Sequence, residues 1–392
     1  MAGSVILAGA RTPIGKLSGA LGGFKATDLG GFAIKAALDR AGVSPDQVDY
    51  VFMGQVLQAG TGQITARQAA VNAGIPMGVP ATTINKVCLS GLNSIFLADL
   101  LIQSGAADIV VAGGMESMTQ APYLLPGARA GYRLGDQSVV DSMMYDGLFC
   151  AFDQVAMGAG TEKYAASCEI LRAPQDEFAA KSHERAAAAI KDGKFADEIV
   201  PVEVPQRKGD PVVVDTDEGV RPGTTVESLG KLRPAFDKAG NITAGNASQI
   251  SDGSAAVIVC SPATAERLGT TPLGTILGYG QVAGPDPSLL TQPSRAILQA
   301  VEKAGKSVSD VDVFEMNEAF AAVGLASMQE LGVTDEVTNV NGGAIALGHP
   351  IGMSGTRLAL TMLHELRRRG GGLGAAGLCG GGGQGDAILL QV

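Results

Sequence analysis

The sequence predicts an α/β fold in which two related β-α-β-α-β halves are joined, with a loop domain inserted between them. The first observation is an internal repeat, because residues 33–53 (AIKAALDRAGVSPDQVDYVFM) align without a gap with residues 296–316 (AILQAVEKAGKSVSDVDVFEM). Each copy reads as an amphipathic helix that ends at Ala-Gly, followed by a connection and by an apolar strand that Val-Asp opens. A chance match between two common α/β patterns is the alternative, and the length of the alignment argues against it.

A second correspondence extends the repeat downstream. Ser90-Gly91 and Ser354-Gly355 each open a helix rich in Leu and Ala, and an apolar run follows each helix, over residues 109–114 and up to Cys379. Short apolar runs after helices are typical of strands that are buried on both faces. The run VILAG near the N-terminus reads as a further strand of the same kind.

The third observation is a change of pattern between the halves. From about Gln120 to Ala244 the chain contains prolines, a helix-like segment over residues 178–190 and an irregular charged run, PVEVPQRKGDPVVVDTDEGVRPGTT. We therefore expect an N-terminal half made of residues 1–120 and 245–270, an inserted loop domain over residues 121–244, and a C-terminal half over residues 271–392. Insertions on rigid scaffolds commonly carry binding residues.

Composition narrows the class of protein. The chain has 392 residues, of which 46% are hydrophobic and 17% charged, so it is expected to pack a core despite its 55 glycines. Its net charge of −10 argues against nucleic acid or acidic lipid as a partner, and it has no apolar run long enough for a membrane span. The five scattered cysteines indicate no disulfide framework, which predicts a reducing cytoplasm.

Cys88 is the first candidate for chemistry. It lies in the segment NKVCLSG, just before a helix expected over residues 92–101. A thiol at a helix N-terminus experiences the positive end of the helix dipole, which favours the thiolate that a nucleophilic cysteine needs. A buried structural cysteine explains this segment equally well.

His349 is the second candidate. It lies in the segment NGGAIALGHPIG, whose glycines and proline predict a tight loop rather than a helix face. The repeat places this loop opposite the segment of Cys88, since each precedes its matching Ser-Gly helix start and related halves packed about a pseudo-twofold axis bring such loops together. Imidazole transfers protons near neutral pH, so we predict a Cys–His pair.

Cys379 ends the last apolar run and leads into GGGGQG. Gly380, Gly382 and Gly385 match a dinucleotide fingerprint, but that motif requires a following helix and the next residues are strand-like. These glycines instead allow close approach to Cys379 and direct N–H groups at a carbonyl oxygen. Asn317 follows the second copy of the repeated strand and is a candidate to hold a water or a carbonyl group; a turn or cap is the alternative.

Four segments of the chain resemble the signature blocks of the thiolase family, and they occur in that family's order. They are Lys86-Val87-Cys88-x-Ser90-Gly91, Asn317-Glu318-Ala319-Phe320, Gly343-Ala344-x-Ala346-Leu347-Gly348-His349-Pro350-x-Gly352 and Cys379-x-Gly381-Gly382-Gly383-Gln384-Gly385. The likeness runs from Ala10-Arg11-Thr12-Pro13 to the C-terminus. It implies a layered α-β-α-β-α core and an acetyl-CoA C-acetyltransferase, which condenses two acetyl-CoA to acetoacetyl-CoA and CoA and catalyses the reverse thiolysis.

The resemblance also implies a role for each reactive residue. Cys88 would attack the acyl-CoA carbonyl with His349 activating its thiol, and Cys379 would remove an α-proton from a second acetyl-CoA. Asn317, through a water, would join His349 in stabilising the enolate, and the N–H groups of Cys88 and Gly381 would stabilise the tetrahedral species. Neither a metal nor a bound cofactor is expected, and coenzyme A thioesters are the expected small-molecule partners.

For the substrate, the resemblance favours Arg221, Thr224 and Ser248 as coenzyme A contacts and Met157 and Leu148 as one wall of the acyl pocket. Basic residues of the insertion other than Arg221 read equally well as solvated surface. The family also implies a homo-oligomer, either a dimer or a tetramer.

The sequence departs at two places from the pattern of short-chain thiolases, and these differences leave the acyl chain length open. Ala156 stands where short-chain members commonly carry a histidine, and residues 286–291 lack a methionine that closes their acyl pocket. A degradative 3-ketoacyl-CoA thiolase for longer chains is therefore the alternative. A binding protein for coenzyme A thioesters that has lost catalysis is the alternative from another class.

The other histidines and cysteines are expected to have no part in the chemistry. His183 lies in a helix of alternating charge and is expected to be exposed, and His364 is expected at a solvated helix end. Cys150, Cys168 and Cys260 read as small core or loop residues.

Overall fold

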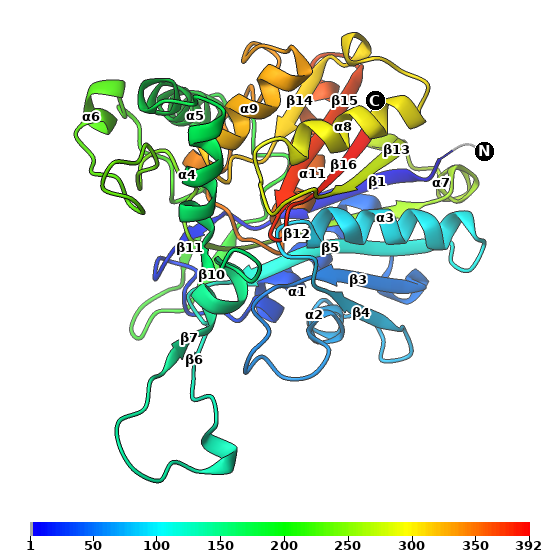
Figure 1. The fold of residues 1–392 in the computed structure, drawn as a ribbon. Coiled ribbons are helices and arrows are strands. Elements are labelled where there is room, and N and C mark those ends of the chain that lie inside the picture. The colour runs from blue at the N-terminus through cyan, green and yellow to red at the C-terminus, as the bar shows by residue number, and fades with distance from the viewer. Residues whose placement is uncertain (1–2) are drawn as a thin grey trace.

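The computed structural model describes residues 3–392 and is organised around ten strands in one sheet, which the two halves share (Figure 1). The strand order is β14-β15-β16-β13-β1-β12-β5-β3-β4, and the short β2 pairs with β12. The halves meet where β1 pairs with β13, through Val5 with Thr275 and Ile6 with Gly274. Strands β3 and β14 run parallel to β5 and β15, respectively, so the same local topology occurs on each side of the junction.

Most elements of the two halves follow the same order along the chain. The N-terminal half contains β1 (Val5–Arg11), β2 (Gly15–Lys16), α1 (Ala26–Ala41), β3 (Tyr50–Gly54), α2 (Thr65–Asn72), β4 (Ala81–Ile84), α3 (Ser90–Gln103), β5 (Ile109–Ser117), β12 (Ser251–Cys260) and α7 (Pro262–Leu268). The C-terminal half contains β13 (Gly274–Ala283), α8 (Gln292–Lys303), β14 (Val313–Met316), α9 (Ala321–Leu331), α10 (Ala344–Leu347), α11 (Ser354–Arg368), β15 (Leu373–Gly380) and β16 (Gln384–Gln391). Of these elements, β2, β4 and α7 belong to the N-terminal half alone and α10 to the C-terminal half alone.

The sequence repeat is a structural repeat, as predicted. Helices α1 and α8 both lead into a glycine with a left-handed backbone, Gly42 at φ 65° and Gly305 at φ 66°, a conformation that glycine adopts without a steric penalty. A short 3-10 turn follows in each half, and a capping box at its N-terminus holds it, from Ser44 and from Ser307. Strands β3 and β14 then begin at matching positions of the two copies.

The helices divide into three layers that alternate with the two halves of the sheet. Buried side chains of α1 and α2 pack on one face of the N-terminal half, and those of α8 and α9 pack on one face of the C-terminal half. Between them lie α3 and α11, whose Leu92 and Leu358 belong to a core that both halves share. Within β5, Val110 faces this central core and Val111 faces α1, as strand alternation requires. The predicted α-β-α-β-α layering is thereby confirmed.

Between β5 and β12 the chain makes short elements and two longer helices. They are β6 (Tyr123–Leu124), β7 (Val140–Asp141), β8 (Phe149–Cys150), β9 (Val155–Ala156), α4 (Met157–Ser167), α5 (Arg172–Lys191), β10 (Val202–Val204), β11 (Val212–Val214) and α6 (Val226–Gly230). The helix expected over residues 178–190 is part of α5. The domain boundaries stay a prediction. No helix within residues 3–392 combines the length and apolar character needed to cross a bilayer.

Candidate active site

Cys88 lies in the loop between β4 and α3, immediately before the first residues of the helix. Its neighbour Val87 has φ 51°, a left-handed conformation that is strained for a β-branched residue and that marks functional sites. Local hydrogen bonds hold this loop: the Val87 N–H donates to Asn85 Oδ1 (3.0 Å), the Lys86 N–H donates to Ser90 Oγ (2.8 Å), and Ser90 Oγ donates to the Val87 carbonyl (2.6 Å). The thiol is therefore presented by a fixed backbone.

His349 follows α10 in the loop before α11 and is 5% exposed. Its Nδ1 lies 2.5 Å from Ser354 Oγ, and this hydroxyl donates its own proton to the Pro350 carbonyl at 2.9 Å. Ser354 must therefore accept a hydrogen bond from Nδ1–H, which leaves Nε2 without a proton. The unprotonated Nε2 lies 3.3 Å from Asn317 Nδ2, which can donate to it, and it is the nitrogen available as a base.

Glu116 connects the loop after β3 with the loop of His349. Its buried carboxylate accepts hydrogen bonds from the N–H groups of Val56 (3.0 Å), Leu57 (3.0 Å) and Gly352 (2.9 Å). Gly114, also on β5, has no room for a side chain, because a β-carbon there would lie 1.9 Å from the Gly352 carbonyl oxygen. The His349 loop is thus seated directly on β5, the strand of the N-terminal half that carries Glu116.

Cys379 lies near the end of β15, next to the turn that begins at Gly381. The glycines of this segment let it approach the Cys88 loop closely. A β-carbon on Gly380 would lie 2.6 Å from Leu89 Cγ, and one on Gly381 would lie 3.5 Å from Val87 Cγ1. The strand-like residues after the glycines form β16, so the fingerprint of a dinucleotide site lacks its helix, as expected.

The structure brings most of the predicted site residues around one small cavity of about 50 Å³, here called the inner cavity. Its lining includes Cys88, His349, Cys379, Gly381, Leu148, Met157 and Ser248. Leu289 also lines it, although the sequence indicated no closing residue in the segment 286–291. The two sulfurs and the imidazole that the duplication was expected to unite therefore share one enclosed space.

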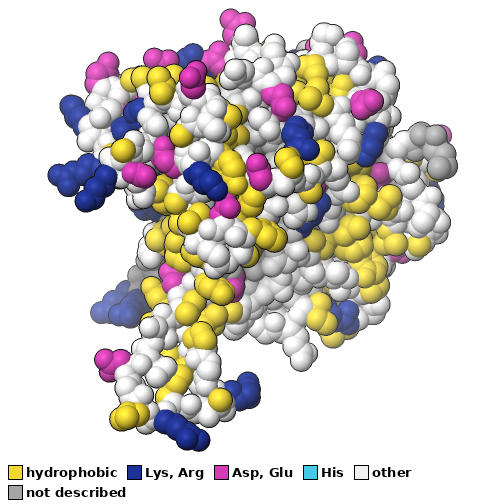
Figure 2. All heavy atoms as spheres, in the orientation of Figure 1, with side chains coloured by type: hydrophobic (Ala, Val, Ile, Leu, Met, Phe, Trp, Pro, Cys, Tyr) yellow, Lys and Arg dark blue, Asp and Glu magenta, His cyan; other side chains and the backbone are white. Residues whose placement is uncertain are grey.

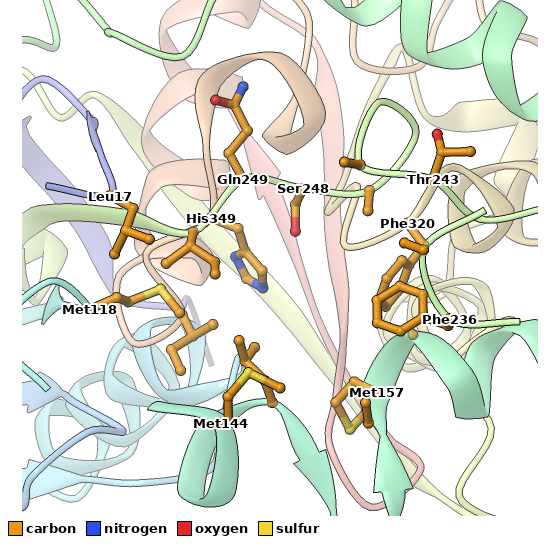
Figure 3. A pocket seen from close by; sticks show the side chains of 18 of the residues that line it. Leu17, Met118, Met144, Met157, Phe236, Thr243, Ser248, Gln249, Phe320 and His349 are labelled. Carbon is orange, nitrogen blue, oxygen red and sulfur yellow. The ribbon is translucent and has the colours of Figure 1, made fainter. Parts of the chain in front are cut away.

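A larger cavity of about 540 Å³, here called the outer cavity, continues from the inner one through shared lining residues such as Met157 and His349. Figure 3 shows the His349 ring projecting into it, with Ser248 nearby, Met144 and Met157 on one side and Phe236 with Phe320 beyond. The lining is mainly apolar, and its charged side chains within residues 3–392 are Lys16 and Arg221. An elongated ligand that is apolar along its length and anionic at one end fits this distribution.

Burial controls the protonation of the reactive groups. It raises the pKa of the Cys88 thiol to about 12, despite the helix N-terminus, and the nearby Glu116 adds to this effect. The expectation that the helix dipole favours a resting thiolate is therefore wrong, because desolvation outweighs it. Burial also lowers the pKa of His349 to about 3, with Arg357 as a further cause. For Cys379, burial and the proximity of Cys88 both raise the pKa. At neutral pH the site holds two thiols and one neutral imidazole.

The predicted binding residues and Asn317 lie in three different places. Arg221, Ser248, Met157 and Leu148 line the outer cavity, whereas Thr224 lies outside its lining and faces a separate shallow depression beside α5. Asn317 is fully buried beside His349, and its Oδ1 has no hydrogen-bond partner within residues 3–392.

Two histidines differ from expectation. His183 is 2% exposed rather than exposed, and its Nδ1 accepts a hydrogen bond from the Arg221 N–H at 3.2 Å. It belongs to a buried stripe of α5 that includes Ala179, Ser182 and Ala186, and this helical spacing was visible in the sequence beneath the alternating charges. His364 is half-buried rather than solvated, because α11 is the central layer of the fold.

A duplicated fold that presents two thiols and an imidazole at the end of a long cavity defines a class of site suited to covalent acyl transfer. The model of the thiolase N-terminal domain matches residues 4–263, and that of the thiolase C-terminal domain matches residues 270–392. The chain belongs to the thiolase family.

Similar curated proteins agree with this family over their full length. A probable acetyl-CoA acetyltransferase of Mycolicibacterium smegmatis is 59% identical over 387 residues, covering 99% of this chain and 100% of the relative. The acetyl-CoA acetyltransferase of Cupriavidus necator is 53% identical over 388 residues, with 99% and 98% covered. That of Pseudomonas aeruginosa is 51% identical over 387 residues, with 98% of each chain covered.

Proposed function

We propose that this thiolase is an acetyl-CoA C-acetyltransferase, which condenses two acetyl-CoA to acetoacetyl-CoA and CoA and catalyses the reverse thiolysis. The observation that carries the proposal is the inner cavity, where Cys88, His349 and Cys379 line a common enclosed space. The names of the relatives support the acetyl substrate.

In the first step, Cys88 attacks the thioester carbonyl while His349 Nε2 accepts the thiol proton. The tautomer that Ser354 imposes supports this role, because it leaves Nε2 free to act as a base. The carbonyl oxygen becomes an oxyanion that the N–H groups of Cys88 and Gly381 stabilise, and CoA leaves as the thiol after taking the proton from His349. The product is an acetyl thioester on Cys88, which keeps the acetyl group activated.

In the second step, Cys379 gives its thiol proton to the neutral His349 and, as the thiolate, takes an α-proton from a second acetyl-CoA. The resulting enolate attacks the carbonyl carbon on Cys88. The new carbon–carbon bond replaces the bond to sulfur, so acetoacetyl-CoA forms and the Cys88 thiolate takes the proton from His349, while Cys379 keeps the α-proton and is again a thiol. Asn317 supports stabilisation of the enolate, since its buried Oδ1, which has no partner among residues 3–392, can hold a water beside His349.

Coenzyme A itself occupies the outer cavity in this proposal. Its apolar walls suit the pantetheine arm, and Arg221 and Lys16 supply positive charge for phosphate in a protein whose net charge is −10. Ser248 lines both cavities and is placed to contact the arm near the thioester. Thr224, which lies outside the outer cavity, would contact only a part of CoA that extends beyond it.

The small inner cavity supports a short acyl group. Leu289 closes it beside Met157, in place of the methionine that segment 286–291 lacks. We expect the kcat/KM for thiolysis of acetoacetyl-CoA to exceed that for a long-chain 3-ketoacyl-CoA by at least about 10- to 200-fold. Leu289→Ala should narrow this ratio, whereas Leu290→Ala, next to it and also buried but outside the inner lining, should leave the ratio unchanged. Equal rates for both substrates would favour the degradative alternative.

We further propose that the chain forms a homo-oligomer. The hairpin of residues 121–142, built on β6 and β7, stands away from the body of the molecule, and hydrophobic side chains are scattered over it (Figures 1 and 2). Its most exposed apolar side chains are Leu134 (96%), Tyr123 (67%), Val139 (57%) and Leu125 (54%). Several exposed apolar side chains on one projecting arm are typical of a protein–protein contact, and a second copy of this chain presents the same arm.

Light scattering tests the oligomer. The protein is expected to have the mass of a dimer or tetramer, and Leu134→Lys combined with Val139→Lys should lower the mass, because each lysine places a charge in the contact. Arg129→Lys, in the same hairpin, preserves charge and serves as the control. A monomeric wild-type protein, or an unchanged mass in the double variant, would contradict the role of the hairpin.

A further inference from the structure

An ion pair joins the segment of the nucleophile to the strand next to that of the second cysteine. Lys86 Nζ lies 2.7 Å and 2.9 Å from the two carboxylate oxygens of Asp386. The side chains are 23% and 4% exposed, so the contact is largely removed from water. Lys86 precedes Cys88 by two residues, and Asp386 pairs with Leu378 on β15, the residue before Cys379.

The pair therefore crosses the junction between the two halves next to the inner cavity, which both cysteines line. Lys86 belongs to the N-terminal half, and Asp386 lies on β16 of the C-terminal half. Asn93 on α3 also approaches the Asp386 carboxylate. The contacts of the two loops themselves involve apolar side chains and glycine, since Leu89 packs over Gly380 and Val87 packs near Gly381. Such contacts resist compression but do not prevent the segments from sliding or separating. A bidentate ion pair is directional and resists both.

We propose that Lys86 and Asp386 are positioning residues, whose ion pair fixes the Cys88 loop against the β15–β16 hairpin and so sets the separation of the two sulfurs. The inference rests on the proposed function, because only the condensation step needs both sulfurs at once. Acylation needs only Cys88 and His349. The position of His349 does not depend on the ion pair, because Ser354 bonds its ring and Glu116 bonds Gly352 in the same loop. Loss of the pair should therefore affect condensation much more than acylation.

The test compares the two half-reactions in a variant that leaves no unpaired charge. Lys86→Met with Asp386→Leu replaces the ion pair by apolar side chains, which commonly preserves stability. Acetylation of Cys88 by acetyl-CoA, followed by mass spectrometry, should stay within about tenfold of wild type. Formation of acetoacetyl-CoA should fall about 100-fold, the usual effect of a misplacement near 1 Å. The single variant Lys86→Arg keeps a cation beside the unchanged Asp386, so it should form acetoacetyl-CoA at a rate close to that of wild type.

Two further variants serve as a control and as a substitute for the double variant. Arg369→Met removes a cation from Glu365, a partly buried ion pair (2.9 Å, 38% and 8% exposed) at the other end of α11 from His349, and should change neither half-reaction. If the apolar double variant does not fold, Lys86→Gln, whose shorter and neutral side chain cannot form the bidentate ion pair, replaces it and should also lose condensation selectively.

A folded variant whose half-reactions are both retained, or both reduced to the same degree, would overturn the inference while the wild type stayed active. A wild-type protein that neither acetylates Cys88 nor forms acetoacetyl-CoA would overturn the proposed function, and this inference with it.

Discussion

Replacing either cysteine of the inner cavity should stop turnover, but at different steps. Cys88→Ser is expected to lower kcat by a factor on the order of 10⁴ or more, with no acetyl group on the peptide of residue 88, because the nucleophile is lost. Cys379→Ser should still accept an acetyl group on Cys88, since its site in the inner cavity is intact, yet condensation should fall by about 10²–10⁴ for want of the base.

Mass spectrometry of the protein after mixing with acetyl-CoA distinguishes the two steps. Cys168→Ser removes an exposed thiol and is the matched control, with turnover expected to equal that of wild type. Acylation lost to the same degree in Cys379→Ser as in Cys88→Ser would contradict the assigned roles. A wild-type protein that never acquires the acetyl group would instead favour the non-catalytic binding protein.

The sequence predicted those parts of the fold that repeat. A helix, a left-handed glycine, a capped turn and a buried strand each have a local signature, and two copies of that signature confirm one another at Gly42 and Gly305. Strands that are apolar on both faces require helices on both sides, whereas the full five-layer arrangement was implied by the resemblance to the thiolase family. The pairing of Cys88 with His349 was found through the same symmetry, since their loops precede matching helices, whereas the coenzyme A and acyl-pocket contacts were implied by the resemblance alone.

Contacts without a periodic or local signature could not be predicted. The ion pair of Lys86 with Asp386 depends on the register of β15 with β16, and the bonds of Glu116 to Gly352 depend on how the halves dock. The prediction that His183 is exposed was wrong, because the charged residues on one face of α5 made the buried stripe on its other face hard to recognise in the sequence. The prediction that Cys88 favours the thiolate was wrong for a related reason. A helix N-terminus can be recognised in a sequence, whereas the degree of desolvation, which raises the pKa of this thiol, cannot.

The protonation state of the resting site leads to the second large expectation, which concerns pH. Burial disfavours charge, so the Cys88 thiol keeps its proton up to its pKa of about 12, and His349 stays neutral down to its pKa of about 3. Between these limits the pair is a neutral thiol and a neutral imidazole. The rate of alkylation of Cys88 by iodoacetamide should therefore rise about tenfold per pH unit from pH 6 to pH 10, because only the thiolate fraction reacts.

A plateau below about pH 8 would contradict this, because it would mean that a thiolate–imidazolium pair already exists in the free protein. Cys168, exposed in the same chain, gives an internal reference for an accessible thiol. With a neutral pair, proton transfer to Nε2 must accompany the attack on acetyl-CoA, so His349→Ala should slow acetylation of Cys88 by about 10²–10⁴. Ser354→Ala should slow it less, since the ring stays in place and loses only the contact that fixes its tautomer. An equal loss in both variants would show that the serine does more than orient the base.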